Sequence, residues 1–174
     1  MNQPELKTTR LVLRAFVQSD SSEVERLAGE KAIALMTLNV PHPYLPGMGL
    51  EWISTHEQGW KDRSRISYAI TLGETGQLVG AMGLVSMSRG EAELGYWIGK
   101  DYWGSGYCTE AAKKLLDFAF LELRLSRVTA RHLAINPASG GVMDKCGMEV
   151  FGTSDGVDRN GKRASFVHYE LSRT

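Results

Sequence analysis

Three strand patterns in a row, joined by glycine turns, constrain the fold of this chain more than any other feature of its sequence. β-Branched and other apolar residues dominate these patterns, which cover residues 67–72, 77–87 and 91–98. The connections, Gly73 to Gly76 and Ser88 to Gly90, favour tight turns. Because tight turns join antiparallel neighbours, residues 67–98 are expected to form a meander.

A long amphipathic helix is expected directly after this meander, at residues 108–123. Its apolar residues recur at helical spacing, with Ala112, Leu115, Leu116, Ala119, Phe120 and Leu123 on one face. Another strand pattern follows at residues 127–134. Residues 91–134 therefore predict a βαβ unit.

The remaining patterns complete a mixed fold. Further strands are expected at residues 10–16, 148–153 and 165–171, and further helices at residues 20–28, 48–62 and 138–146. Asp155-Gly156 and Asn160-Gly161 mark the loop between the last two strands. The sequence thus predicts an α/β (α+β mixed) fold, with a sheet of about seven strands and about four helices. No repeat or linker divides it, so residues 1–174 are expected to form a single domain.

Charge and composition exclude several classes of protein. The 174 residues contain 20 Lys plus Arg and 20 Asp plus Glu, so no basic excess favours nucleic-acid binding. No secretory h-region or run of 18 apolar residues is present, which predicts a cytoplasmic protein without a membrane span. Cys108 and Cys146 are too far apart for a CxxC site, and His56-Glu57 lacks the second histidine of HExxH, so no metal is expected.

The segment GYWIGKDYWGSGYCTEA, from Gly95 to Ala111, is the densest candidate for a binding site. Gly104 and Gly106 let a ligand approach the backbone, and the following helix presents free N–H groups. A phosphate could bind there, or the segment could be an ordinary glycine turn. Thr109 stands where a dinucleotide fingerprint needs its third glycine, and GxxxxGK[ST] occurs nowhere.

Trp103 to Ala111, WGSGYCTEA, resembles the pyrophosphate-binding loop of the GNAT N-acetyltransferases. Trp103 replaces the Gln or Arg of that loop, and Cys108 replaces a small residue. With GYWI before it and TEA after it, the loop resembles the RimJ/RimL branch, named for acetylating the N-termini of ribosomal proteins. The segments TTRLVLRAF, VPHPYLPGMGLEWI and NPASGGVMDKCGM resemble the same branch in the same order.

The resemblance implies a GNAT-like twisted sheet, mostly antiparallel, in which a bulge splays the strand at 91–98 from the strand at 127–134. Acetyl-CoA would bind at this splayed pair, and CoA would be the product. The strand backbone would pair with the pantetheine arm, the loop amides would hold the pyrophosphate, and Thr109 would start the helix. The implied cofactor-binding residues are Tyr96, Trp97, Ile98, Trp103, Gly104, Ser105, Gly106, Tyr107, Cys108, Thr109, Asn136 and Ser139.

The same resemblance implies direct attack of an amine on the thioester, without an enzyme nucleophile. Met143 stands where many GNAT members carry a proton-donating Tyr, so Ser139 is the implied replacement. Asn136 and Ser139 could instead cap a helix around Pro137. Glu93 is the candidate base and substrate contact, with a salt bridge as the alternative.

The acceptor is expected to be a primary amine, either a protein N-terminus or a small molecule. His42 and Tyr44 are candidate substrate-binding residues, or parts of a rigid Pro-rich loop. The leading hypothesis is an acetyl-CoA-dependent N-acetyltransferase. The alternatives are a non-catalytic acyl-CoA-binding domain, suggested by Met143 and Trp103, and a nucleotide-binding βαβ module. The sequence leaves open whether a homodimer forms.

Overall fold

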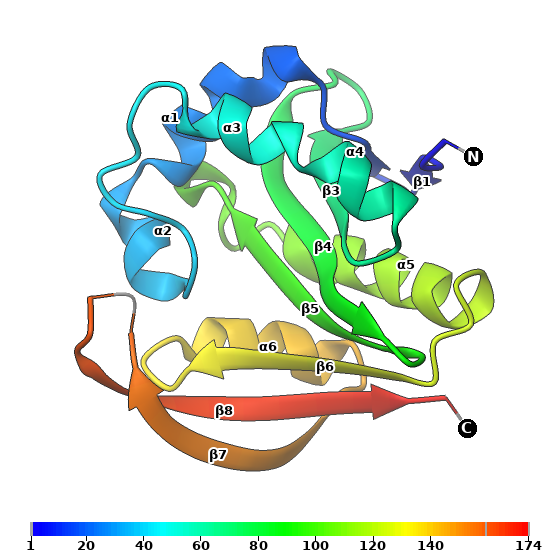
Figure 1. The fold of residues 1–174 in the computed structure, drawn as a ribbon, viewed down its shortest axis with the longest axis vertical. Helices are drawn as coiled ribbons and strands as arrows, with labels where there is room; N and C mark the ends of the chain where they lie inside the picture. The colour runs from blue at the N-terminus through cyan, green and yellow to red at the C-terminus, as the bar shows by residue number, and fades with distance from the viewer. Residues whose placement is uncertain (1, 159, 174) are drawn as a thin grey trace.

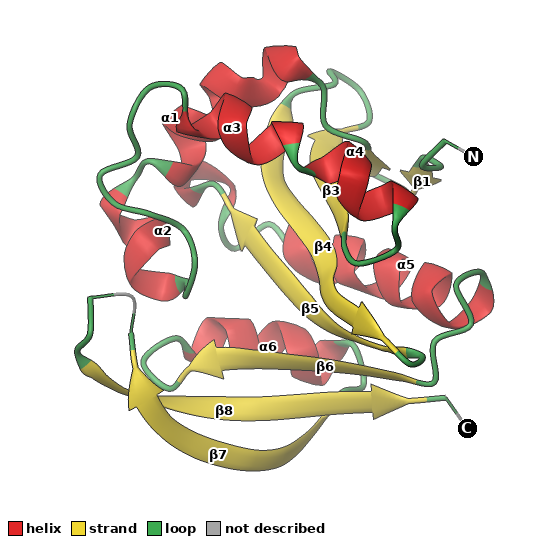
Figure 2. Ribbon diagram, in the orientation of Figure 1, coloured by secondary structure: helices red, strands yellow, loops and turns green. Residues whose placement is uncertain are grey.

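One sheet runs through the protein in the computed structural model, which describes residues 2–158 and 160–173. Its eight described strands lie in the order β1-β2-β3-β4-β5-β6-β8-β7 (Figures 1 and 2). Their bounds are Leu6–Lys7, Leu11–Arg14, Ile66–Leu72, Leu78–Ser88, Glu91–Ile98, Arg127–Leu133, Glu149–Val157 and Arg163–Ser172 for β1 to β8. All neighbouring strands are antiparallel except β5 and β6, which are parallel. The predicted meander and mixed sheet are confirmed.

The described part of the chain contains more helices and strands than the sequence predicts. The six α-helices, α1 to α6, are Ser21–Ala28, Lys31–Met36, Met48–Ser54, His56–Lys61, Tyr107–Leu121 and Pro137–Lys145, with 3-10 turns at Gln18–Asp20 and Lys100–Tyr102. Strand β1 and helix α2 are too short to show a period in the sequence. Strand β7 continues through the expected loop residues Asp155 and Gly156, because both pair with β8.

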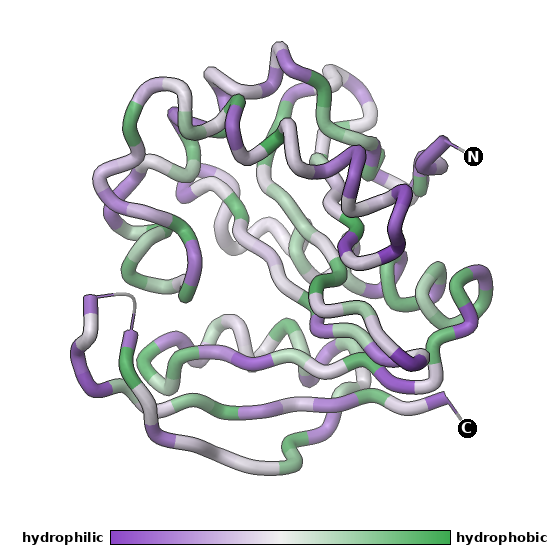
Figure 3. The backbone as a smooth tube through the Cα atoms, viewed as in Figure 1, coloured by the Kyte–Doolittle hydropathy of each residue, from purple (hydrophilic) through white to green (hydrophobic). Residues whose placement is uncertain are grey.

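The predicted helix over residues 48–62 is two helices, α3 and α4. The break lies at Thr55, whose backbone N–H and hydroxyl both donate to the carbonyl of Trp52, at 3.2 Å and 2.8 Å. That carbonyl would otherwise accept the bond that continues the helix. The break turns α4, which is mostly hydrophilic in Figure 3, along the outside of the sheet.

Helices cover both faces of the central strands. Ala111, Ala112, Leu115 and Ala119 of α5 are each 0% exposed and pack in the larger core cluster with strand side chains. A second cluster joins α1, α2 and α3 to the sheet through Ala69, Leu78, Ala81 and Trp97. This double cover explains why β3 is buried along nearly its whole length.

Strands β5 and β6 separate partway along their length. They pair from Glu91 with Arg127 to Leu94 with Ala130, and beyond these pairs each strand continues without the other. Figure 1 shows the resulting V, which opens toward α2 and the start of β8. The splayed pair is confirmed. The four pairs follow in unbroken register, so the strands separate because pairing stops and not because a bulge is inserted within it.

Candidate functional site

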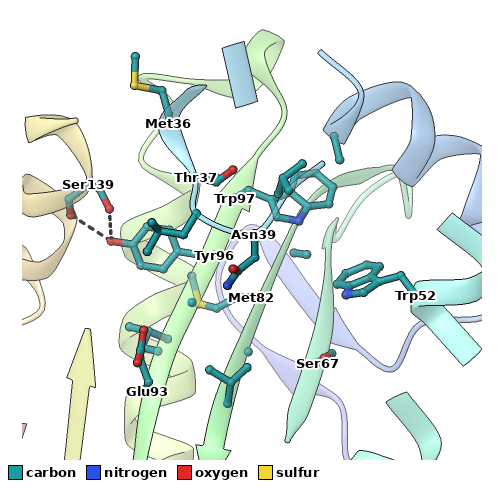
Figure 4. A pocket seen from close by; sticks show the side chains of 18 of the residues that line it. Met36, Thr37, Asn39, Trp52, Ser67, Met82, Glu93, Tyr96, Trp97 and Ser139 are labelled. Atoms are coloured by element: carbon teal, nitrogen blue, oxygen red, sulfur yellow. Dashed lines mark hydrogen bonds between the residues drawn. The ribbon is translucent and has the colours of Figure 1, made fainter. Parts of the chain in front are cut away.

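A cavity of about 620 Å³ lies where β5 and β6 separate. Its walls come from β4, β5, β6 and α6 on one side and from the segment between α2 and α4 on the other. The lining side chains used below are Asn39, Val40, Tyr44, Met48, Glu51, Trp52, Arg65, Met82, Glu93, Tyr96, Trp97, Arg131, Ser139 and Met143. Figure 4 shows Trp52 across the cavity from Tyr96, with Asn39 and Met82 between them.

Tyr96 and Ser139 meet at one end of this cavity. The Tyr96 hydroxyl donates to the Ser139 carbonyl oxygen at 3.0 Å and lies 3.0 Å from Ser139 Oγ. Burial raises the pKa of Tyr96, and the nearby Cys108 raises it further, so the phenol is protonated at neutral pH. Met143, 2% exposed, lines the same end without a proton to give. The sequence predicts a role only for the Tyr96 backbone, so this side-chain pair is a new feature.

Asn136 caps helix α6 and thereby sets the place of Ser139. Its Oδ1 accepts from the Ser139 backbone N–H at 3.4 Å, and Pro137 occupies the first turn. Its Nδ2 donates to the Met36 carbonyl at 3.0 Å, which ties α6 to the end of α2. The capping alternative therefore describes Asn136, whereas the Ser139 side chain faces the cavity.

Glu93 and Arg131 face each other across the splayed strands. Arg131 Nε donates to Glu93 Oε1 at 3.1 Å, and both side chains line the cavity. Glu93 is therefore both a cavity residue, as predicted, and a member of a salt bridge, as the alternative held. Arg131 was not predicted, because its strand pattern carries no sign of what it faces.

The glycine loop follows the carboxyl end of β5. Gly104 and Gly106 have φ values of 75° and 79°, in the left-handed region that favours glycine. Helix α5 begins at Tyr107, one residue before the start that the apolar pattern predicts and two residues before the Thr109 start that the resemblance implies, because Gly106 is its N-cap. The Trp103 indole N–H donates to the Ile98 carbonyl at 2.7 Å and so fastens the loop to β5.

Arg10 holds this loop from the turn between β1 and β2. Its Nη1 donates to the Ser105 carbonyl at 2.9 Å, its Nε donates to Glu110 Oε2 at 2.7 Å, and its guanidinium lies 4.7 Å from the centre of the Tyr107 ring. Burial alone would raise the pKa of Glu110, but hydrogen bonds from Thr8 and Arg10 lower it. Nothing in the sequence pattern links Arg10 to a loop 95 residues away.

Neither cysteine has the surroundings of a nucleophile. Cys108 and Cys146 are free thiols that pack against the larger core cluster. Burial raises the pKa of both, and for Cys108 the neighbouring Cys146 raises it further. Among residues 2–158 and 160–173, no group of three or more His, Cys, Asp or Glu is placed to hold a metal.

The Pro-rich loop before α3 contributes only one of its two predicted residues to this cavity. Tyr44 is half-buried in the cavity wall, and burial together with Glu25 raises its pKa. His42 precedes a cis peptide bond to Pro43 and is not among the lining residues. Trp52 and Asn39 take part instead. Trp52 carries no sequence signal beyond its place in the segment VPHPYLPGMGLEWI, and Asn39 lies one residue before that segment.

The predicted cofactor residues fall in two groups. Tyr96, Trp97 and Ser139 line the cavity, whereas Ile98 and the loop from Trp103 to Thr109 lie beyond its lining, where the chain leaves β5. The glycine loop therefore follows the end of the strand, β5, whose residues Tyr96 and Trp97 line the cavity. The remaining predicted residue, Asn136, caps α6 and does not line the cavity.

Comparison with known proteins gives matches in sequence and in structure. The chain is 36% identical over 66 residues to an uncharacterised N-acetyltransferase, p20 of Bacillus licheniformis, a match that spans 37% of each protein. It is 24% identical to an uncharacterised N-acetyltransferase, YoaA of Bacillus subtilis (strain 168), over 84% of this chain and 83% of YoaA. RimL, a ribosomal L7/L12 alpha-N-protein acetyltransferase solved with coenzyme A, superposes with a TM-score of 0.89 at 16% identity, over 97% of this chain and 98% of RimL.

None of the described helices is long and apolar enough to cross a membrane.

The acetyltransferase (GNAT) domain matches residues 10–149, which include strands β2 to β6, where the sheet splays, and helix α6. A match over this much of the chain shows that the protein belongs to the GNAT acetyltransferase family.

Proposed function

We propose that this protein transfers the acetyl group of acetyl-CoA directly to a primary amine, on a protein N-terminus or a small molecule, and releases CoA. The observation that carries the proposal is the cavity in which the splayed strands, Ser139 and the partly buried Tyr96 phenol come together. The family match supports acetyl transfer as the reaction.

The donor would lie along the V. The edge of β5 from Tyr96 to Ile98 that faces away from β4 is open to the pantetheine arm, because β6 no longer pairs with this part of β5, although the Ile98 carbonyl also accepts from the Trp103 indole. The amides from Gly104 to Cys108 and the N-terminus of α5 suit the pyrophosphate. A Cβ at Gly104 would meet nothing within 4 Å, so the loop is open to a ligand on that side.

Ser139 and Tyr96 would supply the proton that the departing sulfur needs. The amine nitrogen bonds to the thioester carbon, the carbon–sulfur bond breaks, and the sulfur leaves with the electron pair of that bond. When Tyr96 turns its proton from the Ser139 carbonyl to Ser139 Oγ, the Ser139 hydroxyl is free to donate to the sulfur. The protonated state of Tyr96 at neutral pH suits this relay.

The proton lost by the amine would go toward Glu93, which lines the same cavity and forms a salt bridge with Arg131. An α-amine of pKa ~7.8 is partly neutral at pH 7, whereas a lysine-like amine of pKa ~10.4 needs about 3.5 kcal/mol more for deprotonation. A carboxylate already engaged in a salt bridge suits the α-amine better.

Release of CoA thiol from acetyl-CoA in the presence of an amine panel tests the proposal. Ser139→Ala and Tyr96→Phe are expected to lower kcat about 100-fold, the usual scale for loss of a proton donor, with the Kd for CoA nearly unchanged. Ser126→Ala is the control, because Ser126 is exposed and its hydroxyl donates to the Gly90 carbonyl outside the cavity. Full activity in both cavity variants would overturn these roles.

A non-catalytic acyl-CoA-binding domain is the second candidate, favoured by Met143 in the cavity wall. CoA binding without thiol release for any amine would support it and overturn transfer. We place either activity in the cytoplasm, since both cysteines are free thiols.

A further inference from the structure

The end of the cavity opposite Tyr96 is apolar and aromatic. Trp52 lies there, Val40, Tyr44 and Met48 also line the cavity, and Val40, Tyr44 and Trp52 pack against the second core cluster. Figure 4 shows Trp52 across the cavity from the end that holds Tyr96 and Ser139, with Ser67 on the same side as Trp52. If acetyl transfer takes place at Ser139, this wall is what the acceptor's substituent meets.

Trp52 is held in place by other rings. His56 contacts it edge-on at 4.4 Å between ring centres, and Phe16 contacts it at 5.1 Å. His56 is 7% exposed, and burial lowers its pKa to about 4, so the histidine is neutral at pH 7. Trp52 therefore packs against two uncharged rings, His56 and Phe16, which gives the cavity a rigid apolar wall.

The charges of the described lining cancel. They are two carboxylates, Glu51 and Glu93, and two guanidiniums, Arg65 and Arg131, and Glu93 already pairs with Arg131. A polyamine brings at least two positive charges and needs carboxylates without cationic partners. This cavity offers it no net negative charge, so a polyamine is a poor fit.

We infer that the acceptor is a primary amine that carries an apolar or aromatic group close to the nitrogen and no second positive charge. The inference rests on the proposed transfer function and adds the class of substrate. An arylalkylamine and a peptide with an apolar first residue share this chemistry, because each places a hydrophobic group a few bonds from a reactive nitrogen. In either case the amine would face Ser139 and the apolar group would contact Trp52.

The first test compares kcat/KM for acetylation of 2-phenylethylamine, ethanolamine and spermidine, and of two peptides that differ only in a first residue of Phe or Ser. We expect 2-phenylethylamine to exceed ethanolamine and spermidine about ten-fold or more, the scale of discrimination by an apolar pocket. The peptide pair tests the same preference on a peptide, and the Phe peptide compared with 2-phenylethylamine shows whether the natural source is a peptide or a small amine. Spermidine or ethanolamine turned over as well as 2-phenylethylamine would overturn the inference while leaving transfer intact.

The second test changes Trp52, the aromatic residue of this wall labelled in Figure 4. The ratio to follow is kcat/KM for 2-phenylethylamine divided by kcat/KM for ethanolamine. Trp52→Ala is expected to reduce this ratio to within about threefold of one, with the KM for acetyl-CoA unchanged. Trp52→Phe is expected to restore most of the ratio. Leu50→Ala on the same helix is the matched control, because Leu50 is 44% exposed and does not line the cavity. An unchanged ratio in folded Trp52→Ala protein would overturn the role of this wall. No CoA release with any amine would overturn the transfer function itself.

Discussion

His56 is a buried histidine between Phe16 and Trp52, and neither of its ring nitrogens has a hydrogen-bond partner among the described residues. Burial lowers its pKa from 6.5 to about 4, and the nearby Arg65 lowers it further. A single neutral ring thus supports the aromatic wall of the cavity. Protonation of this ring would place an unpaired charge in an apolar site.

This depressed pKa predicts a loss of stability in mild acid. The unfolded chain takes up the proton near pH 6.5 and the folded chain only near pH 4. The stability of the protein with respect to His56 is therefore fully present above pH 6.5 and is lost progressively as the pH falls toward 4. Between pH 7.5 and pH 5 the loss should be about 2 kcal/mol in the free energy of unfolding, measured by urea titration.

His56→Phe should remove this part of the pH dependence, and His168→Gln, at a partly exposed position on β8, should retain it. The two variants are compared with the wild type by the same urea titrations. A His56→Phe protein that loses as much stability as the wild type would contradict the assignment.

Helix α5 and the glycine loop are joined to the first strands by Arg10. Its bonds to Ser105 and Glu110 connect the turn between β1 and β2 to the segment where the helix begins. The pair is partly exposed, so its worth to the fold is about 1 kcal/mol or less. Its larger effect should be on the shape of the loop.

Arg10→Ala is expected to raise the Kd for CoA about ten-fold while kcat at saturating acetyl-CoA stays within about twofold, because the loop loses its anchor before the ligand binds. Calorimetry with CoA measures the first quantity and thiol release the second. Arg26→Ala, which breaks an exposed i,i+3 pair with Glu23 on α1, should change neither. Equal CoA affinity in the Arg10 variant would rule out a loop anchor.

Two glycines near the site should respond to alanine in opposite directions. Gly106 has a φ of 79°, where a side chain costs about 1–2 kcal/mol, so Gly106→Ala should lower the melting temperature. Gly141 lies within α6 with nothing within 4 Å of an added Cβ, so Gly141→Ala should stabilise by about 0.5–1 kcal/mol. Thermal melts of both variants check the signs, and the same sign for both would contradict the argument.

The whole molecule is a sheet that is nearly divided in two. Strands β1 to β5 form one part, β6 to β8 form the other, and only the four residue pairs from Glu91–Arg127 to Leu94–Ala130 join β5 to β6. The second core cluster lies within the larger part, whereas the larger cluster extends across both parts and includes Val128 of β6, Tyr169 of β8 and Met143 of α6, the helix that covers the smaller part (Figure 2). A ligand in the V would replace the pairing that the strands lack.

CoA at about 100 times its Kd should therefore stabilise the protein by about 2.7 kcal/mol, which corresponds to a rise of roughly 5–10 °C in melting temperature. Hydrogen exchange of the Tyr96 to Ile98 amides should slow in parallel, because the ligand covers this edge. NADPH at the same concentration should leave the melting temperature unchanged. A rise with NADPH and none with CoA would support the nucleotide-binding alternative instead.

The sequence by itself determined the kinds of elements and their order. The meander, the amphipathic face of α5 and the left-handed glycines of the loop follow from local periods and from glycine's backbone freedom, so short segments specify them. The motif order then predicted the family and the splayed strands. Local pattern was too weak for β1 and α2, whose two and six residues owe their form to packing.

Only the tertiary structure decided which side chains meet at the site. Tyr96 and Ser139 are 43 residues apart, Glu93 and Arg131 are 38 apart, and Arg10 and Ser105 are 95 apart. A strand pattern shows which face a side chain takes, but the partner on that face depends on how distant elements pack. The same packing brought Trp52 into the cavity and left His42 out of it, because a break at Thr55 and the course of one loop set their directions.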